Sequence, residues 1–183
     1  MKTQIERVDV NKLPKSVSQP YLLTKNFDFN IHESRIVIRV LQQIKQHQFI
    51  KLGSQIDLDN NVVMRFRPKD LTVGNDLNLV YKALSSIRNK EIILNGTATD
   101  EGEEVETRTI TGFINEATYA VNNSFVDIKI NADWFNMLVD LSKGYTPYLS
   151  NVGFQTGNRH HLIIYQYICH WFKKDSIEGL ELN

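Results

Sequence analysis

Three histidines and the single cysteine of the chain lie in one short stretch, residues 156–174, and such side chains can bind a metal ion or carry redox chemistry. Helical geometry tests this, because each residue of an α-helix turns by about 100° and rises by about 1.5 Å. His161 and His170 would lie on opposite faces about 13 Å apart, and His160 and Cys169 would also point away from each other. One helix cannot bring two of them to one ion, so we predict no metal site and no cofactor.

The same stretch is typical of an amphipathic helix, because one continuous arc of its helical wheel is apolar. The apolar arc consists of Leu162, Ile164, Tyr165, Ile168, Cys169, Trp171 and Phe172. The polar arc consists of Arg159, Gln166, His170, Lys173 and Lys174. Ile163 is the one residue that departs from this pattern. We predict that the apolar arc is buried, either against the rest of the chain or against a second copy.

Length and charge set the next limits. The chain has 183 residues, of which 42% are apolar, so it is long enough for one sizeable domain with a core, or for one and a half small ones. Its 21 basic and 21 acidic residues balance, so the total charge gives no argument for binding nucleic acid. The distribution of charge along the chain does give such an argument. Residues 65–90 hold six basic and two acidic residues, whereas residues 97–127 hold seven acidic residues and only one basic residue, Arg108.

Several classes of protein are excluded by what the sequence lacks. Cys169 has no partner for an intrachain disulfide, which predicts a buried, inert thiol in a reducing compartment. The first ten residues are charged and lack the apolar stretch of a secretory signal, and no apolar run is long enough to cross a membrane. No phosphate-binding glycine loop or nucleophile elbow occurs. We predict a cytoplasmic protein that is not an enzyme, although an active site assembled from distant residues stays open.

The positions of the charged side chains depend on the helices and strands that carry them. Residues 1–20 are polar and contain two prolines, which predicts a flexible N-terminal arm. Residues 30–49 predict a first helix, because Asn30 and Glu33 have the spacing of a capping box and apolar residues follow at helical intervals. The later part of the chain predicts a strand at residues 124–130, a helix at 132–141 and an extended segment at 142–149.

Residues 68–90 have the pattern of a helix-turn-helix. Pro68 can open a short helix, Gly74 ends it, and Asn75 or Asp76 can cap the second helix. The chain then predicts a strand at residues 91–94, an acidic loop at 95–106 and a second strand at 107–114. Helix, short helix, turn, helix and hairpin in this order predict an α+β fold of the winged-helix type, with the hairpin as its wing.

Four stretches together resemble the plasmid replication initiators of the RepB/RepE type. They are ESRIVIRVLQQI, DLNLVYKALSSIRNKEIIL, SFVDIKINADWFNMLVDLSKGYTPYLS and RHHLIIYQYICHWFKK. The most specific part is a helix that ends in DLSKGYTPY, residues 140–148, followed by a second helix around His161–Ile168. This chain departs from the family at Ile163, where an arginine is usual.

The resemblance implies two successive winged-helix domains. Residues 21–150 would form the first, and residues 151–183 would form the junction and the first helix of a second, truncated domain. It further implies that the protein binds double-stranded DNA at the repeated sites of a replication origin, the iterons. A homodimer formed through the first domain and contacts with host replication proteins are also implied, with no membrane association.

If the helix-turn-helix docks on DNA, the exposed side of its second helix offers groove contacts and nearby basic residues offer phosphate contacts. The groove candidates are Asn78, Lys82, Ser85 and Asn89. The phosphate candidates are Arg65, Arg67, Arg88 and Lys90, together with Arg159, Lys173 and Lys174 at the junction. A charged helix face can also be simply solvated, and that alternative stays open.

The acidic loop argues against DNA contact by the predicted wing. Thr99–Glu106 carries five acidic residues, which would repel phosphates beside them. We therefore expect this hairpin to face away from DNA or to meet a basic protein surface. The alternative function is a winged-helix transcriptional regulator, or a protein-interaction module that does not bind DNA directly.

Overall fold

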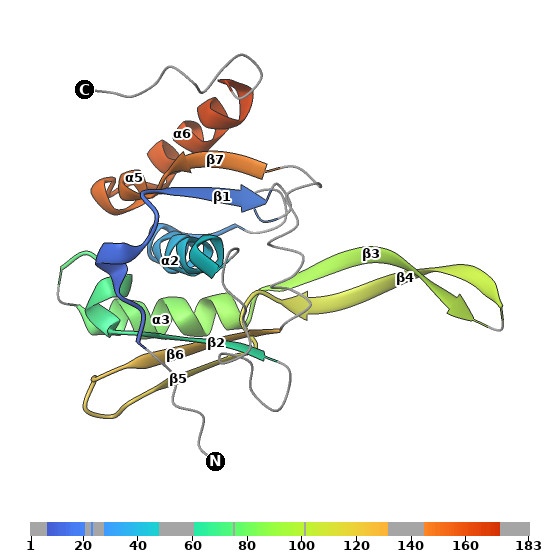
Figure 1. The fold of residues 1–183 in the computed structure, drawn as a ribbon, viewed down its shortest axis with the longest axis horizontal. Helices are drawn as coiled ribbons and strands as arrows, with labels where there is room; N and C mark the ends of the chain where they lie inside the picture. The colour runs from blue at the N-terminus through green and yellow to red at the C-terminus, as the bar shows by residue number, and fades with distance from the viewer. Residues whose placement is uncertain are drawn as a thin grey trace.

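The structure is a computed structural model that describes residues 7–20, 23, 28–47, 61–74, 76–100, 102–131 and 145–172. Its elements, labelled in Figure 1, are η1 (Val10–Lys12), β1 (Ser16–Pro20), α2 (Ile31–His47), β2 (Asn61–Phe66), η2 (Pro68–Leu71), α3 (Leu77–Arg88), β3 (Glu91–Asp100), β4 (Glu103–Gly112), β5 (Glu116–Tyr119), β6 (Val126–Asn131), β7 (Tyr145–Leu149), α5 (Ser150–Gln155) and α6 (Arg159–Phe172). This mixture of helices and antiparallel strands confirms the predicted α+β class. The predicted helix at residues 132–141 lies outside the described residues.

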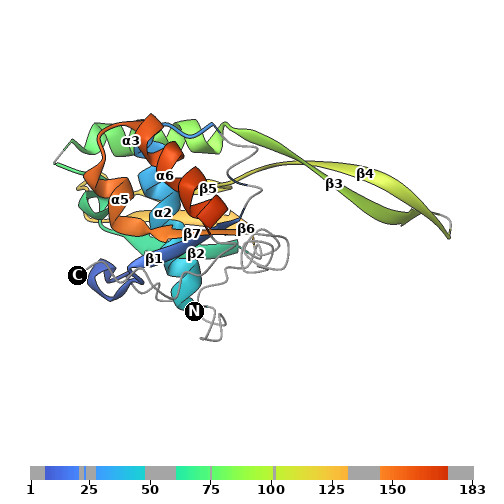
Figure 2. The ribbon, with the colours of Figure 1, turned by 90° about the horizontal axis from the view of Figure 1, so that it is seen from above.

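The strands form three antiparallel sheets, with the orders β2-β6-β5, β1-β7 and β3-β4. Figure 1 shows α2 and α3 between the β1-β7 pair on one side and the β2-β6-β5 sheet on the other. The β3-β4 pair projects away from this body as a long ribbon, which Figure 2 shows from a second direction. The body therefore has α2 and α3 between two sheets in this view, with α6 packed on β7 beyond them.

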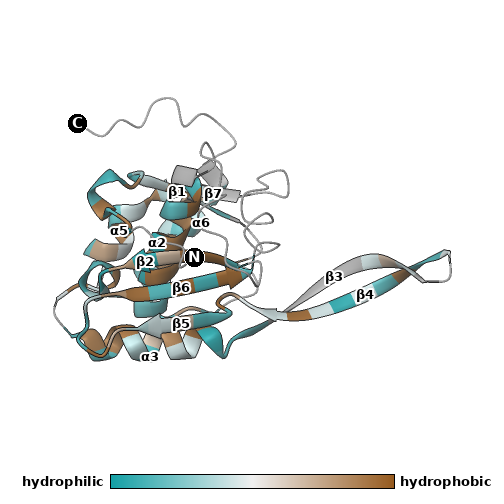
Figure 3. Cartoon of the chain, turned by 60° about the horizontal axis from the view of Figure 1, so that its bottom comes forward, coloured by the Kyte–Doolittle hydropathy of each residue, from teal (hydrophilic) through white to brown (hydrophobic). Residues whose placement is uncertain are grey.

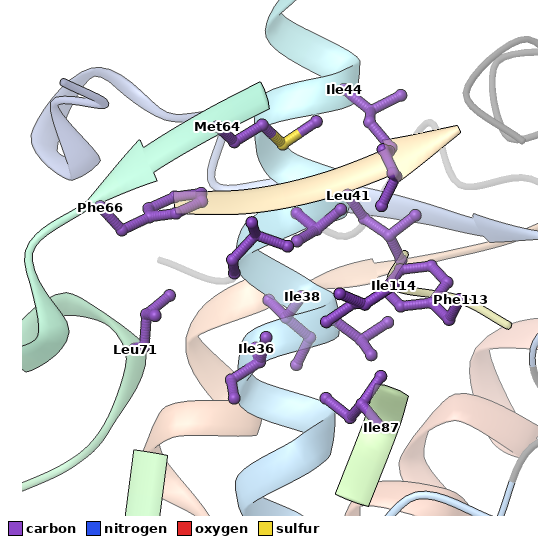
Figure 4. Packing of buried hydrophobic residues seen from close by; sticks show 14 of the residues in the cluster. Ile36, Ile38, Leu41, Ile44, Met64, Phe66, Leu71, Ile87, Phe113 and Ile114 are labelled. Carbon is purple, nitrogen blue, oxygen red and sulfur yellow. The ribbon is translucent and has the colours of Figure 1, made fainter. Parts of the chain in front are cut away.

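Helix α2 is the centre of the core. Its predicted capping box is confirmed: Asn30 Oδ1 accepts the Glu33 amide hydrogen at 3.0 Å, and Glu33 Oε2 accepts the Asn30 amide hydrogen at 2.8 Å. Apolar side chains on several sides of α2 meet those of β2, η2, α3 and the segment before β5. Figure 4 labels some of them: Ile36, Ile38, Leu41, Ile44, Met64, Phe66, Leu71, Ile87, Phe113 and Ile114.

Polar side chains of α2 hold it to α5. Arg35 donates from Nε to the Gly153 carbonyl oxygen at 3.2 Å and from Nη2 to that of Thr156 at 2.9 Å. Gln42 donates from Nε2 to Ser150 Oγ at 2.8 Å. Each of these buried polar groups therefore has a partner on the neighbouring helix, as buried polar groups require.

The prediction of a flexible arm is wrong for residues 7–20. Strand β1 pairs with β7 over its whole length, from Ser16 opposite Leu149 to Pro20 opposite Tyr145. The apolar side chains before and within it, Val8, Leu13 and Val17, are buried in the main core. The strand is stabilised by a partner far along the chain, which local composition cannot indicate.

Helix α6 forms as predicted, but its buried side differs from the prediction. Leu162 is buried as expected, whereas Ile164 is 57% exposed and Gln166 is buried. Gln166 Nε2 donates to Gln19 Oε1 at 3.3 Å, so its amide has a partner inside the protein. Ile163, the residue that departs from the wheel pattern, lines a small cavity together with Val37 of α2 and therefore lies on the packing side. Apolar residues surround nearly the whole helix, so the wheel alone does not determine which side faces the body.

Helices α5 and α6, which the sequence placed at a junction and at the start of a second domain, pack on α2 and β7. The Leu149 amide donates to Tyr165 Oη at 3.1 Å, and the rings of Tyr148 and Tyr165 meet edge to face with centroids 6.3 Å apart. Leu162 belongs to the same core as α2. Within the described residues, α6 is therefore part of the same body as the helix-turn-helix.

Candidate nucleic-acid interface

The helix-turn-helix is built by local signals that the sequence shows. Pro68 occupies the first turn of η2, and Gly74 in the following turn has φ +84°, a conformation that favours glycine. Asp76 caps α3, its Oδ1 accepting the Asn78 amide hydrogen at 3.0 Å. These residues fix the angle at which α3 leaves the turn.

One face of α3 is buried and the opposite face is exposed. The buried residues are Val80, Ala83, Leu84 and Ile87. The predicted groove candidates, Asn78, Lys82, Ser85 and Asn89, all lie on the exposed side. Their spacing of four, three and four residues places them in one stripe along the helix. We call this stripe the α3 face; Arg88 is also exposed and lies at its edge.

Arg65, a predicted phosphate contact, instead holds the sheet together. Its Nε and Nη2 donate to the two carboxylate oxygens of Asp127 on β6, each at 2.7 Å. Its guanidinium also lies 4.1 Å from the centre of the Phe125 ring. The hydrogen bonds with Asp127 raise the pKa of Arg65 above its ordinary value. The charge of Arg65 is thus neutralised inside the protein, which lowers its attraction for phosphate.

Arg67 is paired in a similar way. Its Nε and Nη2 donate to the carboxylate of Asp70 in η2 at 2.8 and 3.2 Å. The hydrogen bond with Asp70 raises the pKa of Arg67. This pair closes the start of η2 and leaves Arg67 with a structural role.

Two further predicted contacts join the ends of three helices. Lys90, just after α3, lies 3.3 Å from Glu33 Oε2 in the first turn of α2. Arg159, at the start of α6, forms an ion pair with Asp28. Each of these two basic side chains therefore has an acidic partner within the protein. Lys173 and Lys174 lie outside the described residues, so of the predicted contacts the structure brings together the α3 face and Arg88.

The strand order of the sheet beside α3 assigns the wing to a different connection from the one predicted. A winged helix has one strand before the helix-turn-helix and two after it, joined by the wing. Here β2 pairs with β6 and β6 with β5, so the connection between β5 and β6, residues 120–125, occupies the wing position. The predicted hairpin is present as β3 and β4, but it is inserted between α3 and β5. Strand β5 has only four residues, too few to predict from sequence.

The β5-β6 turn is attached to α3. Tyr81 Oη donates to Asn123 Oδ1 at 2.5 Å, and the Tyr81 ring stacks on Tyr119 with centroids 4.4 Å apart. Within the turn, Asn122 Oδ1 accepts the Ser124 amide hydrogen at 3.1 Å. The dipeptide Asn122–Asn123 is a turn signal in the sequence, but only the structure shows that this turn lies beside α3.

The acidic ribbon leaves the body at the other end of α3. Strands β3 and β4 pair over ten residues each, so most of the predicted loop at residues 95–106 is strand, with Gly102 at φ +90° in the turn. Figures 1 and 2 show the ribbon continuing beyond the C-terminal end of α3, and Figure 3 shows the hydrophilic stretches of β4. Ten residues span about 33 Å. Acids near the tip are therefore more than a Debye length of about 8 Å from the ribbon base.

Two absences concern only the described part of the chain. None of its helices combines the length and the apolar composition needed to cross a membrane. Nor do histidine, cysteine, aspartate and glutamate side chains gather there in groups of three or more that could hold a metal ion.

Comparison with known proteins supports this interpretation of the fold. A family model described as the WH1 domain of the initiator replication protein matches residues 15–169, from the residue before β1 almost to the end of α6. No curated protein matches the chain. The match covers most of the sequence and contains the helix-turn-helix, the β2-β6-β5 sheet and the ribbon. The chain therefore belongs to the initiator replication protein family, and its described body is the WH1 winged-helix domain.

Proposed function

We propose that this protein initiates plasmid replication in the cytoplasm by binding the iterons of a replication origin through the α3 face, and that it dimerises through the same domain. The observation that supports DNA binding is the α3 face itself: a capped, exposed helix of a helix-turn-helix in an initiator family member, with the acidic ribbon directed away. The proposal includes no enzymatic activity.

The side chains of the α3 face suit the major groove. Asparagine amides pair with the adenine edge, lysine with guanine or phosphate, and serine with either type of base. Asn78 lies near the N-terminal end of α3, the end that contacts bases in helix-turn-helix proteins. Arg88, at the other end, is positioned for a phosphate rather than a base.

Substituting Lys82 tests this proposal. We expect Lys82→Ala to weaken binding to a duplex carrying the origin repeat and, if Lys82 contacts phosphate, to reduce the slope of log K against log salt by about 0.9. Fluorescence anisotropy at several salt concentrations measures both quantities. Lys12→Ala, a change of equal charge on the exposed η1, is the control. Unchanged affinity and slope for Lys82→Ala would contradict DNA binding by α3.

The proposed dimer contact is the outer edge of β4. Among the described residues β4 pairs only with β3, so its other edge offers unpaired backbone groups to a second strand. Two β4 strands paired antiparallel about Thr107 would place Glu106 of each opposite Arg108 of the other. A register centred on Glu106 would place Arg108 of each copy opposite Glu104 of the other, but it would also place the two Glu106 side chains opposite each other, which is unfavourable. The charge pattern of β4 thus supports pairing with its own copy in one register.

A charge exchange tests this register. Glu106→Arg and Arg108→Glu should each place like charges opposite one another twice and weaken the dimer about tenfold, whereas the double variant should restore it. Sedimentation equilibrium measures the dimer dissociation constant. Glu104→Arg, which changes the net charge equally but faces Ile110 in this register, is the control. A double variant no stronger than either single variant would contradict the pairing.

A further inference from the structure

We propose that a cavity between α2, α6 and β1 binds a free short-chain carboxylate, with the charged group on Arg159 and the aliphatic chain inside. The cavity has a volume of about 80 Å³. One ordered water needs about 10–15 Å³ and an engineered cavity of about 150 Å³ holds benzene, so this cavity has room for a chain of about three carbon atoms. The proposal does not depend on DNA binding by the α3 face.

The cavity follows one side of α6. Arg159, Ile163 and Gln166 line it, and their spacing of four and three residues places them in one stripe. The stripe is about 10 Å long, because each helical residue rises by about 1.5 Å. Gln166 Nε2 donates to Gln19 Oε1 at 3.3 Å, so neutral amides lie at one end and Arg159 lies at the other. A ligand would therefore meet a positive charge at one end only.

Arg159 has an unused hydrogen-bond donor. Its Nη2 pairs with Asp28, whereas its Nε is buried and has no partner in the part of the chain that the structure describes. Arg65 and Arg67 each donate from Nε and Nη2 together to one carboxylate, the bidentate geometry that a guanidinium fits best. A carboxylate that replaced Asp28 and took both donors of Arg159 would satisfy the one that Asp28 leaves unpaired.

Asp28 can be displaced at little cost. Its side chain is 77% exposed, and that of Arg159 is 34% exposed. An ion pair open to water contributes little to stability. The charged end of the cavity is thus at the surface, where a dissolved anion can reach it, and Asp28 competes with that anion for Arg159.

The rest of the lining suits a hydrocarbon chain. Leu23, Phe29 and Val37 face the cavity together with Ile163, and the first three belong to the main core. No acidic side chain is among the described residues that line it. A single negative charge on a short apolar chain, as in propionate or butyrate, matches one arginine beside an apolar wall.

Titration with sodium butyrate tests the proposal. In two-dimensional amide NMR spectra of the full chain, we expect the signals of Ser34, Ile163 and Gln166 to shift with a dissociation constant of about 1 mM, an ordinary value for a ligand of this size. Butyramide, which has the same shape without the charge, should bind about tenfold more weakly. Sodium chloride is the ionic control. Absence of these shifts at about 50 mM butyrate, or equal binding of butyrate and butyramide, would overturn the site.

Two variants test the roles of the charged residues. Arg159→Gln removes the positive charge and should weaken butyrate binding about tenfold. Asp28→Asn removes the competing carboxylate and should strengthen binding about threefold. Arg108→Gln, the same loss of charge on the exposed ribbon, is the control and should leave the dissociation constant unchanged. Should Arg159→Gln fail to fold, Asp28→Asn decides alone: an affinity no higher than that of the parent would contradict the exchange at Arg159.

Discussion

Replacing Gly153 by alanine is expected to lower the free energy of unfolding by about 1 kcal/mol, although alanine is the better helix former. At an interior helical position, Gly→Ala alone would stabilise by about 1 kcal/mol. Here α5 crosses α2 so closely that a Cβ at this position would overlap Ile38 Cδ1, and Ile38 is 1% exposed. Overpacking a core costs about 1–3 kcal/mol. Arg35, bonded to the Gly153 carbonyl, resists withdrawal of α5.

Shortening Ile38 should destabilise the parent protein but stabilise the Gly153→Ala variant. Ile38→Val alone removes a buried methyl group and should cost about 1 kcal/mol. Combined with Gly153→Ala, it removes the overlapping atom, so the double variant should be more stable than Gly153→Ala. Urea denaturation of the four proteins measures the coupling. Gly157→Ala, where no atom lies within 4 Å of the added Cβ, is the control. Simple additivity of the two changes would contradict the proposed close contact.

Asp127→Ala is expected to lower the free energy of unfolding by about 3 kcal/mol, because it leaves the Arg65 guanidinium unpaired between β2 and the Phe125 ring. Asp127 is 6% exposed and accepts both hydrogen bonds of Arg65 at 2.7 Å. Glu116→Ala is the matched control, since Glu116 pairs with Lys129 on the same sheet but is exposed. Loss of an exposed pair should cost less than about 1 kcal/mol.

The same thermal or urea measurement distinguishes two roles of Arg65. If Arg65 serves mainly to contact phosphate, removing its partner Asp127 should hardly change the free energy of unfolding. If Arg65 instead fixes β2 to β6, removing Asp127 should lower the free energy of unfolding as much as breaking a buried ion pair does. Equal effects of Asp127→Ala and Glu116→Ala would contradict the structural role assigned to Arg65.

Much of the helix-turn-helix could be predicted because its signals are local. The Asn30–Glu33 capping box, the Asp76 cap and the buried and exposed sides of α3 follow from spacing within a few residues. Strand β6 and the extended segment of β7 were also evident from pattern or composition. In each case, the residues that determine the structure are close together in the sequence.

The features that sequence did not predict depend on distant partners. Strand β1 pairs with β7, whose sequence lies more than a hundred residues later. Arg65 and Asp127 are separated by 62 positions, so their ion pair cannot be predicted from the local sequence. The wing was misplaced because the short β5 becomes recognisable only through its pairing with β6.

The insertion of the ribbon directly after α3 gives this domain a built-in spacer. Only Asn89 and Lys90 separate the last residue of α3 from the first residue of β3. Two copies joined through β4 about Thr107 would have the bases of their ribbons at opposite ends of the joint, about 33 Å apart for ten residues. One turn of B-DNA is about 34 Å. In the proposed dimer this separation would be close to one helical repeat of DNA, so insertions or deletions in the ribbon should alter the distance between two bound sites.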